Sequence, residues 1–122
     1  MSRLKNLFKK DENKLIVFIT AGFPKKESTE DLVLQAIEGG ADMIEIGIPF
    51  SDPQADGPII QRASEIALSN GISLSIIFDQ VNSIRKKTDI PIALMGYYNP
   101  ILAYGIDNFL NDCKNSQIDG II

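Results

Sequence analysis

The sequence predicts an α/β fold in which parallel strands alternate with helices. Apolar runs of strand length recur along the chain, and the segments between them space their apolar residues as a helix does. Glycine and proline mark several of the boundaries. The patterns follow one another as strand, helix, strand, loop, helix, helix, strand, helix, strand. This is the order expected of a parallel sheet with helical crossovers.

Four strands are predicted from segments rich in apolar residues. They lie at residues 15–21, 43–47, 90–97 and 119–122. The first is nearly continuous in apolar residues, which is typical of a strand covered on both faces. In the second, the two-residue period places Glu45 on the face opposite to Ile44 and Ile46, which are expected to meet the helices.

Helices are predicted between the strands and before the first of them. Their expected extents are residues 28–38, 58–70, 73–87 and 106–116, with a short helix around residues 4–8 that would cap the bottom of the fold. Ser28 and Thr29 are candidate N-caps of the first long helix. Pro58 suits the first turn of the next one, and Gly71 would end it.

The fourth predicted strand is apolar and stands last in the sequence. As a final strand it would present an unpaired edge to water, which finished domains usually avoid. An eight-stranded (β/α) barrel typically needs about 250 residues, roughly twice this length. We therefore expect residues 1–122 to form a single incomplete domain, the first half of a (β/α)8 or TIM barrel with parallel strands.

Composition excludes several classes of function. Of 122 residues 44% are hydrophobic, and the net charge of -4 argues against non-specific nucleic-acid binding. No segment approaches the roughly 20 apolar residues of a membrane span, and no signal-peptide core is seen, so we expect no membrane association and a cytoplasmic location. The chain has no histidine and a single cysteine, Cys113. An internal disulfide, histidine-based triads and most zinc sites are therefore excluded, and no metal site is expected.

Glu45 is the first candidate catalytic residue. It stands near the carboxyl end of the second predicted strand, where parallel α/β folds bind ligands and carry out reactions. In a mostly apolar barrel mouth, near Phe18 and Met95, its carboxyl group could act as a general acid and base. A structural glutamate held in an ion pair is an equally open interpretation of the spacing alone.

Asp56 is the second candidate, and it lies in the loop after the same strand. Its small neighbours could let the loop turn the carboxylate across the strand ends, and loops on a rigid scaffold often supply such groups. Two other interpretations stay open. Asp56 could cap the helix that begins at Pro58, which is a frequent use of aspartate, and Asp52 stands in similar turn chemistry.

Aromatic residues near the ends of the first and third predicted strands suit a ligand that contains a ring. Tyr97 and Tyr98 follow the third strand, and Phe18 lies on the first. A core or surface role for these side chains is the more common alternative. The sequence carries no Gly-rich phosphate-binding fingerprint of the P-loop or dinucleotide kind.

The sequence resembles the tryptophan synthase alpha subunit family over nearly its whole length. The loop after the second strand carries the family's active-site signature, which reads EIGIPFSDPQADGP at residues 45–58. The other matching segments are FITAGFP at 18–24, GGAD at 39–42, LMGYYNP at 94–100 and DGII at 119–122. An ordered set of this kind is far more specific than one short motif.

The resemblance implies a TIM barrel that cleaves indole-3-glycerol phosphate to indole and glyceraldehyde 3-phosphate. The reaction is a retro-aldol cleavage, and the family performs it without a cofactor of its own. Carried over by motif, Glu45 matches the family's catalytic acid-base glutamate and Asp56 its catalytic aspartate. Phe18 and Tyr97 match family positions that line the indole pocket, and Met95 is expected to bind the substrate with them.

The resemblance also implies a protein partner. In the family the alpha subunit joins a beta subunit, which uses pyridoxal phosphate, in an alpha2beta2 heterotetramer. The residues expected near that contact are Pro49, Asp52, Asn99 and Pro100.

The family's phosphate-binding loops and mobile lid lie in the second half of the barrel. We therefore expect little or no lyase activity from residues 1–122 alone. One alternative is a related isomerase barrel, although the Glu45 signature speaks against it. The other is a non-catalytic half-barrel that self-associates or docks on a beta subunit.

Overall fold

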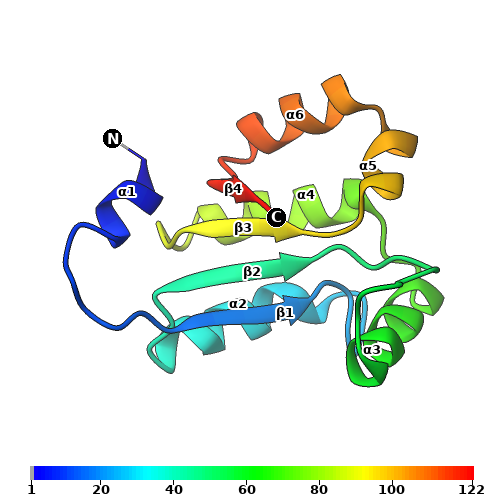
Figure 1. Ribbon diagram of the computed structural model, residues 1–122, viewed down its shortest axis with the longest axis horizontal. Coiled ribbons are helices and arrows are strands. Elements are labelled where there is room, and N and C mark those ends of the chain that lie inside the picture. Colours follow the sequence, from blue (N-terminus) through cyan, green and yellow to red (C-terminus); the bar gives the residue numbers. More distant parts are fainter. Residues whose placement is uncertain (1) are drawn as a thin grey trace.

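A computed structural model describes residues 2–122 of the chain (Figure 1). The helices are α1 Arg3–Leu7, α2 Ser28–Glu38, α3 Pro58–Ser69, α4 Leu74–Arg85, α5 Tyr98–Tyr104 and α6 Ile106–Asn115. The strands are β1 Ile16–Thr20, β2 Met43–Gly47, β3 Ile92–Met95 and β4 Gly120–Ile121. None of these helices is long and apolar enough to cross a membrane.

The strands form one parallel sheet in the order β1-β2-β3-β4. Each strand lies beside the next one in sequence, so the sheet is wound in a single direction, as the wall of a barrel is. The predicted α/β class with parallel strands is confirmed.

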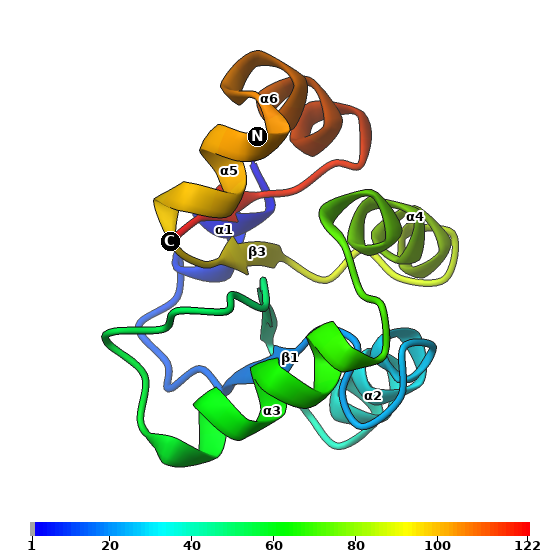
Figure 2. The same ribbon diagram turned by 90° about the vertical axis from the view of Figure 1, so that its right-hand side faces the viewer.

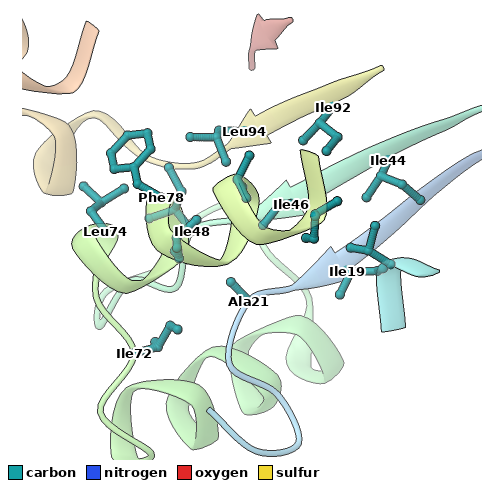
Figure 3. Packing of buried hydrophobic residues seen from close by; sticks show 14 of the residues in the cluster. Ile19, Ala21, Ile44, Ile46, Ile48, Ile72, Leu74, Phe78, Ile92 and Leu94 are labelled. Atoms are coloured by element: carbon teal, nitrogen blue, oxygen red, sulfur yellow. The ribbon is translucent and has the colours of Figure 1, made fainter. Parts of the chain in front are cut away.

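The helices α2 and α4 pack on one face of the sheet and against each other (Figures 1 and 2). The side chains of Ile44, Ile46 and Leu94 are fully buried on this face and belong to one core cluster with helix residues. Figure 3 shows them against α4. Burying a side chain of this size contributes about 1.5–3 kcal/mol each, so this layer is the main source of stability.

Among the described helices none packs along the opposite face as α2 and α4 do on the first, and the loop between β2 and α3 runs on that side (Figure 2). Two rows of side chains, set by the strand register, point to this face. The first row is Phe18, Glu45 and Ala93, and the second is Thr20, Gly47 and Met95. As predicted, Glu45 therefore lies opposite to the buried isoleucines of its own strand.

The short helix α1 lies at the amino ends of the strands (Figure 1). A Cβ built on Gly120 would lie 3.4 Å from Leu4 Cδ1 and 3.7 Å from Ala93 Cβ, so α1 sits against the lower end of β3 and β4. The expected cap at the bottom of the fold is confirmed.

Asp119 ties this bottom end together. Its carboxylate accepts from Arg85 Nη2 at 2.6 Å, from the Ile92 N–H at 2.9 Å and from Arg3 Nη1 at 3.2 Å. The Arg85 and Asp119 side chains are each only 6% exposed. Burial lowers the pKa of Arg85, and the nearby Asp119 carboxylate opposes that shift. One buried carboxylate therefore joins α1, α4, β3 and the start of β4.

The helix α5 was not predicted, and β3 ends at Met95 rather than at residue 97. Asn99-Pro100 falls inside the first turn of this helix. Proline is tolerated there because the first-turn N–H groups have no partner within the helix.

The predicted caps of α2 are wrong. Its N-cap is Glu27, which makes no side-chain cap hydrogen bond. The two hydroxyls are used in the preceding loop instead, because Ser28 Oγ accepts from the Lys25 N–H and Thr29 Oγ1 accepts from the Gly22 N–H. They fix the turn between β1 and α2. The Pro58 start of α3 agrees with prediction, and Ser73, the first residue of the helix predicted over 73–87, is the N-cap of α4.

Candidate functional site

The strand β2 holds Glu45 between two neighbours. The register pairs it with Phe18 of β1 and with Ala93 of β3, and its side chain is half-buried. None of the ion pairs formed within residues 2–122 includes Glu45. The interpretation of Glu45 as an ion-paired structural residue therefore gains no support.

A cavity of about 170 Å³ opens at the carboxyl ends of the strands. Four predicted site residues line it: Phe18, Asp56, Met95 and Tyr97. Asp56 is the only charged residue of its lining, and most of the remaining lining is apolar. An apolar hollow with one converging polar group is the usual form of a small-molecule site.

Asp56 does not cap the helix that follows it. The N-cap of α3 is Gly57, and no side chain makes a cap hydrogen bond there. Instead, Asp56 Oδ2 accepts from the Tyr97 hydroxyl at 3.2 Å. Gln61 Nε2 donates to the backbone oxygen of Asp56 at 2.7 Å, which fastens the loop to the first turn of α3. The capping interpretation is wrong, and the carboxylate belongs to the cavity.

Glu45 itself is not part of the cavity lining. The ring of Phe18 stands over Gly47, which is the next residue along β2 on the same face as Glu45. Consecutive same-face positions on a strand are about 6.6 Å apart, so Glu45 lies one row below the cavity floor. The structure brings Asp56 and the aromatic residues together and leaves Glu45 adjacent to them.

Two of the four residues expected at a partner contact share one hollow beside the loop between β2 and α3. Asp52 and Asn99 are exposed and line one shallow hollow with Phe50, Gln54, Tyr97 and Tyr98. Asp52 Oδ2 accepts from Ser51 Oγ at 2.9 Å, and Asp52 does not line the cavity with Asp56. Pro49 is buried and Pro100 half-buried, so they present little or no surface.

Sequence reasoning missed the contribution of α3 to the cavity. Ile60 and Ser64 stand one turn apart on this helix and line the cavity with Thr20. Their spacing was a usable signal, because residues four apart share a helix face and Asp56 is just ahead of them in the chain.

The described residues contain no group of three or more His, Cys, Asp or Glu side chains that could hold a metal ion. Cys113 is buried on α6, and burial raises the pKa of its thiol to about 11. A neutral, buried thiol is a poor nucleophile, so Cys113 is not a candidate for covalent chemistry.

The fold and the cavity define one class of protein, the parallel (β/α) barrels that bind ligands at the carboxyl ends of their strands. The family model described as "Tryptophan synthase alpha chain" matches residues 4–122. The chain belongs to the tryptophan synthase alpha chain family, whose members are lyases of tryptophan biosynthesis.

Named relatives agree with this assignment. The tryptophan synthase alpha chain of Petrotoga mobilis is 50% identical over 122 residues, which are 100% of this chain and 47% of that protein. The alpha chain of Caldanaerobacter subterraneus subsp. tengcongensis is 52% identical over 98% of this chain and 46% of its own length. The chain thus spans about half the length of the curated relatives it matches.

Solved tryptophan synthase structures also match this chain. A crystal structure of tryptophan synthase subunit alpha from Legionella pneumophila matches with a TM-score of 0.95 and 41% identity, over 99% of this chain and 48% of that one. An X-ray structure of the tryptophan synthase complex from Pyrococcus furiosus matches with a TM-score of 0.82 and 48% identity, over 88% of this chain and 44% of that one. The family has no cofactor of its own, and pyridoxal phosphate belongs to the beta subunit.

Proposed function

We propose that this chain supplies the indole-binding half of an active site that cleaves indole-3-glycerol phosphate to indole and glyceraldehyde 3-phosphate. The observation that carries the proposal is the meeting of Asp56, Phe18, Met95 and Tyr97 around one apolar cavity at the strand ends. Family membership supports the same reaction. The proposal includes a single incomplete barrel domain over residues 1–122 and a cytoplasmic location.

In this proposal Glu45 moves the proton. Protonation of indole C3 by the Glu45 carboxyl group makes the ring an electron-poor indoleninium cation. The bond between C3 and the glycerol side chain then breaks, and its electron pair returns to the ring. The hydroxyl of the departing carbon becomes the aldehyde and gives its proton back to Glu45. The carboxyl group thus ends as it began, and no oxidant or cofactor is consumed.

Glu45 needs only a local movement to reach the ring. It lies on the row below the cavity, beside Phe18, and no ion pair within residues 2–122 holds it there. A glutamate side chain can swing its carboxyl group by several ångströms through rotamer changes alone. Movement past the edge of the Phe18 ring would bring the proton donor to indole C3.

Asp56 stabilises the cation in this proposal. Its ionised carboxylate accepts a hydrogen bond from the indole N–H, which becomes more acidic as positive charge develops. A fixed opposite charge in an apolar cavity acts more strongly than in water, and it needs no reorganisation at the moment of reaction. Residues 1–122 carry no Gly-rich phosphate loop, and in this proposal the second half of the family's barrel binds the polar rest of the substrate.

The partner proposed for the complete assembly is a tryptophan synthase beta subunit. Its contact surface would be the hollow lined by Asp52 and Asn99, beside the loop that carries Asp56. The printed title of the Pyrococcus furiosus structure, a tryptophan synthase complex, supports an assembly of this kind.

The test is complementation. The chain is mixed with the C-terminal remainder of the Petrotoga mobilis alpha chain, and indole released from indole-3-glycerol phosphate is measured. We expect little or no release by either piece alone, release by the mixture, and loss of release when the chain carries Glu45→Gln. Indole binding should survive that substitution. A stable complex that releases no indole, or one in which Glu45→Gln turns over normally, would refute the proposal.

A second candidate is a non-catalytic half-barrel that self-associates or docks on a beta subunit. The observation that favours it is the apolar character of the uncovered face, where Phe18 is 36% exposed and Met95 38% exposed. Measurement of mass in solution together with indole release separates the two. A dimer that gives no indole even in the complemented mixture favours this candidate.

A further inference from the structure

We propose that Tyr97 is a positioning residue. Its hydroxyl holds the loop between β2 and α3 so that one oxygen of Asp56 stays free for the N–H of an indole-type ligand. This inference rests on the proposed function, and it assigns to the Tyr97 hydroxyl a role beyond that of a cavity wall.

The Tyr97 hydroxyl makes two hydrogen bonds to adjacent residues of the loop. It accepts from the Ala55 N–H at 2.8 Å and lies 3.2 Å from Asp56 Oδ2. A hydroxyl has a single proton. Because the Ala55 N–H occupies a lone pair, that proton is available for the carboxylate, and Tyr97 is the donor to Asp56.

This arrangement divides the two oxygens of the Asp56 carboxylate. Oδ2 is engaged by Tyr97, and no hydrogen bond within residues 2–122 engages Oδ1. Asp56, Ala55 and Tyr97 all line the same apolar cavity. The free oxygen therefore has a fixed direction, and a ring N–H in the cavity can donate to it.

Tyr97 is itself well placed to act as an anchor. It follows the end of β3, and the neighbouring ends of β2 and β3 are joined by a hydrogen bond from the Ile48 N–H to the Met95 oxygen at 2.8 Å. Its ring packs on Phe50, with centroids 5.3 Å apart, at the start of the same loop. Ring and hydroxyl together hold the loop at both ends against the sheet.

A purely structural tyrosine would support the loop without affecting ligand choice. The two roles differ in one measurable respect. Loss of general support weakens the binding of every apolar ligand, whereas misdirection of Asp56 weakens only the binding of ligands that carry an N–H. The comparison of indole with 1-methylindole isolates that difference, because the methyl group removes the donor.

The experiment measures binding of indole and of 1-methylindole to the 122-residue chain by NMR titration, in the unmodified chain and in three variants. Tyr97→Phe removes the hydroxyl and keeps the ring. Asp56→Ala removes the acceptor and is the reference for a chain that no longer distinguishes indole from 1-methylindole. Tyr104→Phe is the matched control, because it removes another tyrosine–aspartate hydrogen bond, to Asp112, and neither residue lines the cavity. Exchange of the Ala55 amide proton is followed in the same samples.

We expect the unmodified chain and Tyr104→Phe to prefer indole over 1-methylindole. In Tyr97→Phe the preference falls by about three- to tenfold, the size of one hydrogen bond, while 1-methylindole binds nearly as before. The Ala55 amide exchanges several-fold faster in Tyr97→Phe alone. An unmodified chain without preference would refute the Asp56 role in the proposed function and this inference with it. Preference retained in Tyr97→Phe would overturn this inference alone.

Discussion

The ring of Phe18 occupies the space that a side chain at position 47 would need. A Cβ built on Gly47 would lie 2.8 Å from Phe18 Cε2, closer than Cβ atoms approach other carbons. Because Gly47 leaves this room, Phe18 leans from β1 across β2 and forms a wall of the cavity. The same ring stands between Glu45 and the cavity, so one glycine sets the relation between the two parts of the candidate site.

Gly47→Ala should displace the Phe18 ring. Overpacking of this kind costs about 1–3 kcal/mol, and the displaced ring would narrow the cavity. We expect a lower free energy of unfolding and weaker indole binding, measured by urea denaturation and NMR titration. Gly39→Ala is the control, because a Cβ there meets only backbone oxygens at 3.4 Å or more. Equal behaviour of the two variants would show that Phe18 can move aside freely.

Asp119→Ala should be the most damaging single change at the bottom of the fold. It leaves the buried guanidinium of Arg85 without its carboxylate, and breaking a buried pair in this way costs about 3–5 kcal/mol. Asp89→Ala is the control, because Asp89 also binds Arg3 but its side chain is 88% exposed. That exposed pair should contribute no more than about 1 kcal/mol. Similar losses of unfolding free energy in Asp119→Ala and Asp89→Ala would contradict the stabilising role assigned to the buried Asp119–Arg85 pair.

Stability should depend on pH through Glu30. Its carboxylate bonds to Lys87 Nζ at 2.6 Å, and this contact holds the pKa of Glu30 below its ordinary value of 4.5. A carboxyl group of this kind stabilises the fold above its unfolded pKa and loses that contribution as the pH falls through the folded value. Glu30→Gln should therefore lose less stability than the unmodified chain as the pH falls below 4.5. Denaturation at a series of pH values measures this difference.

The size of the Glu30 effect should be a fraction of 1 kcal/mol, because surface pairs are screened by water. Glu38→Gln makes the same charge change at the other end of α2 and controls for net charge. If the unmodified chain and Glu30→Gln show the same dependence of unfolding free energy on pH, the Glu30–Lys87 pair does not contribute to the loss of stability in acid.

Cys113 should resist alkylation in the folded chain. Its thiol has an ordinary pKa of 9.0, which burial raises to about 11. At pH 9 the thiolate fraction is therefore about 50-fold smaller in the folded than in the unfolded chain, since the thiolate is the reactive form. Iodoacetamide labelling followed by mass spectrometry should be slower by at least that factor without denaturant. Equal rates with and without denaturant would show that the thiol is accessible.

The sheet was predictable from sequence because its strands carry their own signals. The apolar run around β1 and the two-residue period of β2 place Ile44 and Ile46 in the core and Glu45 on the other face, as the structure has them. The family signature predicted Asp56 as a site residue, whereas the local sequence pattern alone favoured a helix cap. The rest depends on tertiary contacts, which leave little trace in local sequence.

Three features show this limit. Thr29 looked like a helix cap, yet its hydroxyl accepts from the Gly22 N–H across a turn that only the folded chain forms. The helix α5 was hidden because Asn99-Pro100 is equally typical of a turn. The position of Glu45 below the cavity depends on how Phe18 leans over Gly47, a matter of ring orientation that no periodicity reports.

The Asp119 carboxylate joins positions that are more than a hundred residues apart, from Arg3 near the beginning of the chain to β4 near its end. Release of α1 takes one donor from this carboxylate, and release of β4 takes the carboxylate away from the buried Arg85, so both ends of the chain act on the same charge. Loosening at one end should therefore weaken the other, and cleavage within α1 should loosen the start of β4 as well.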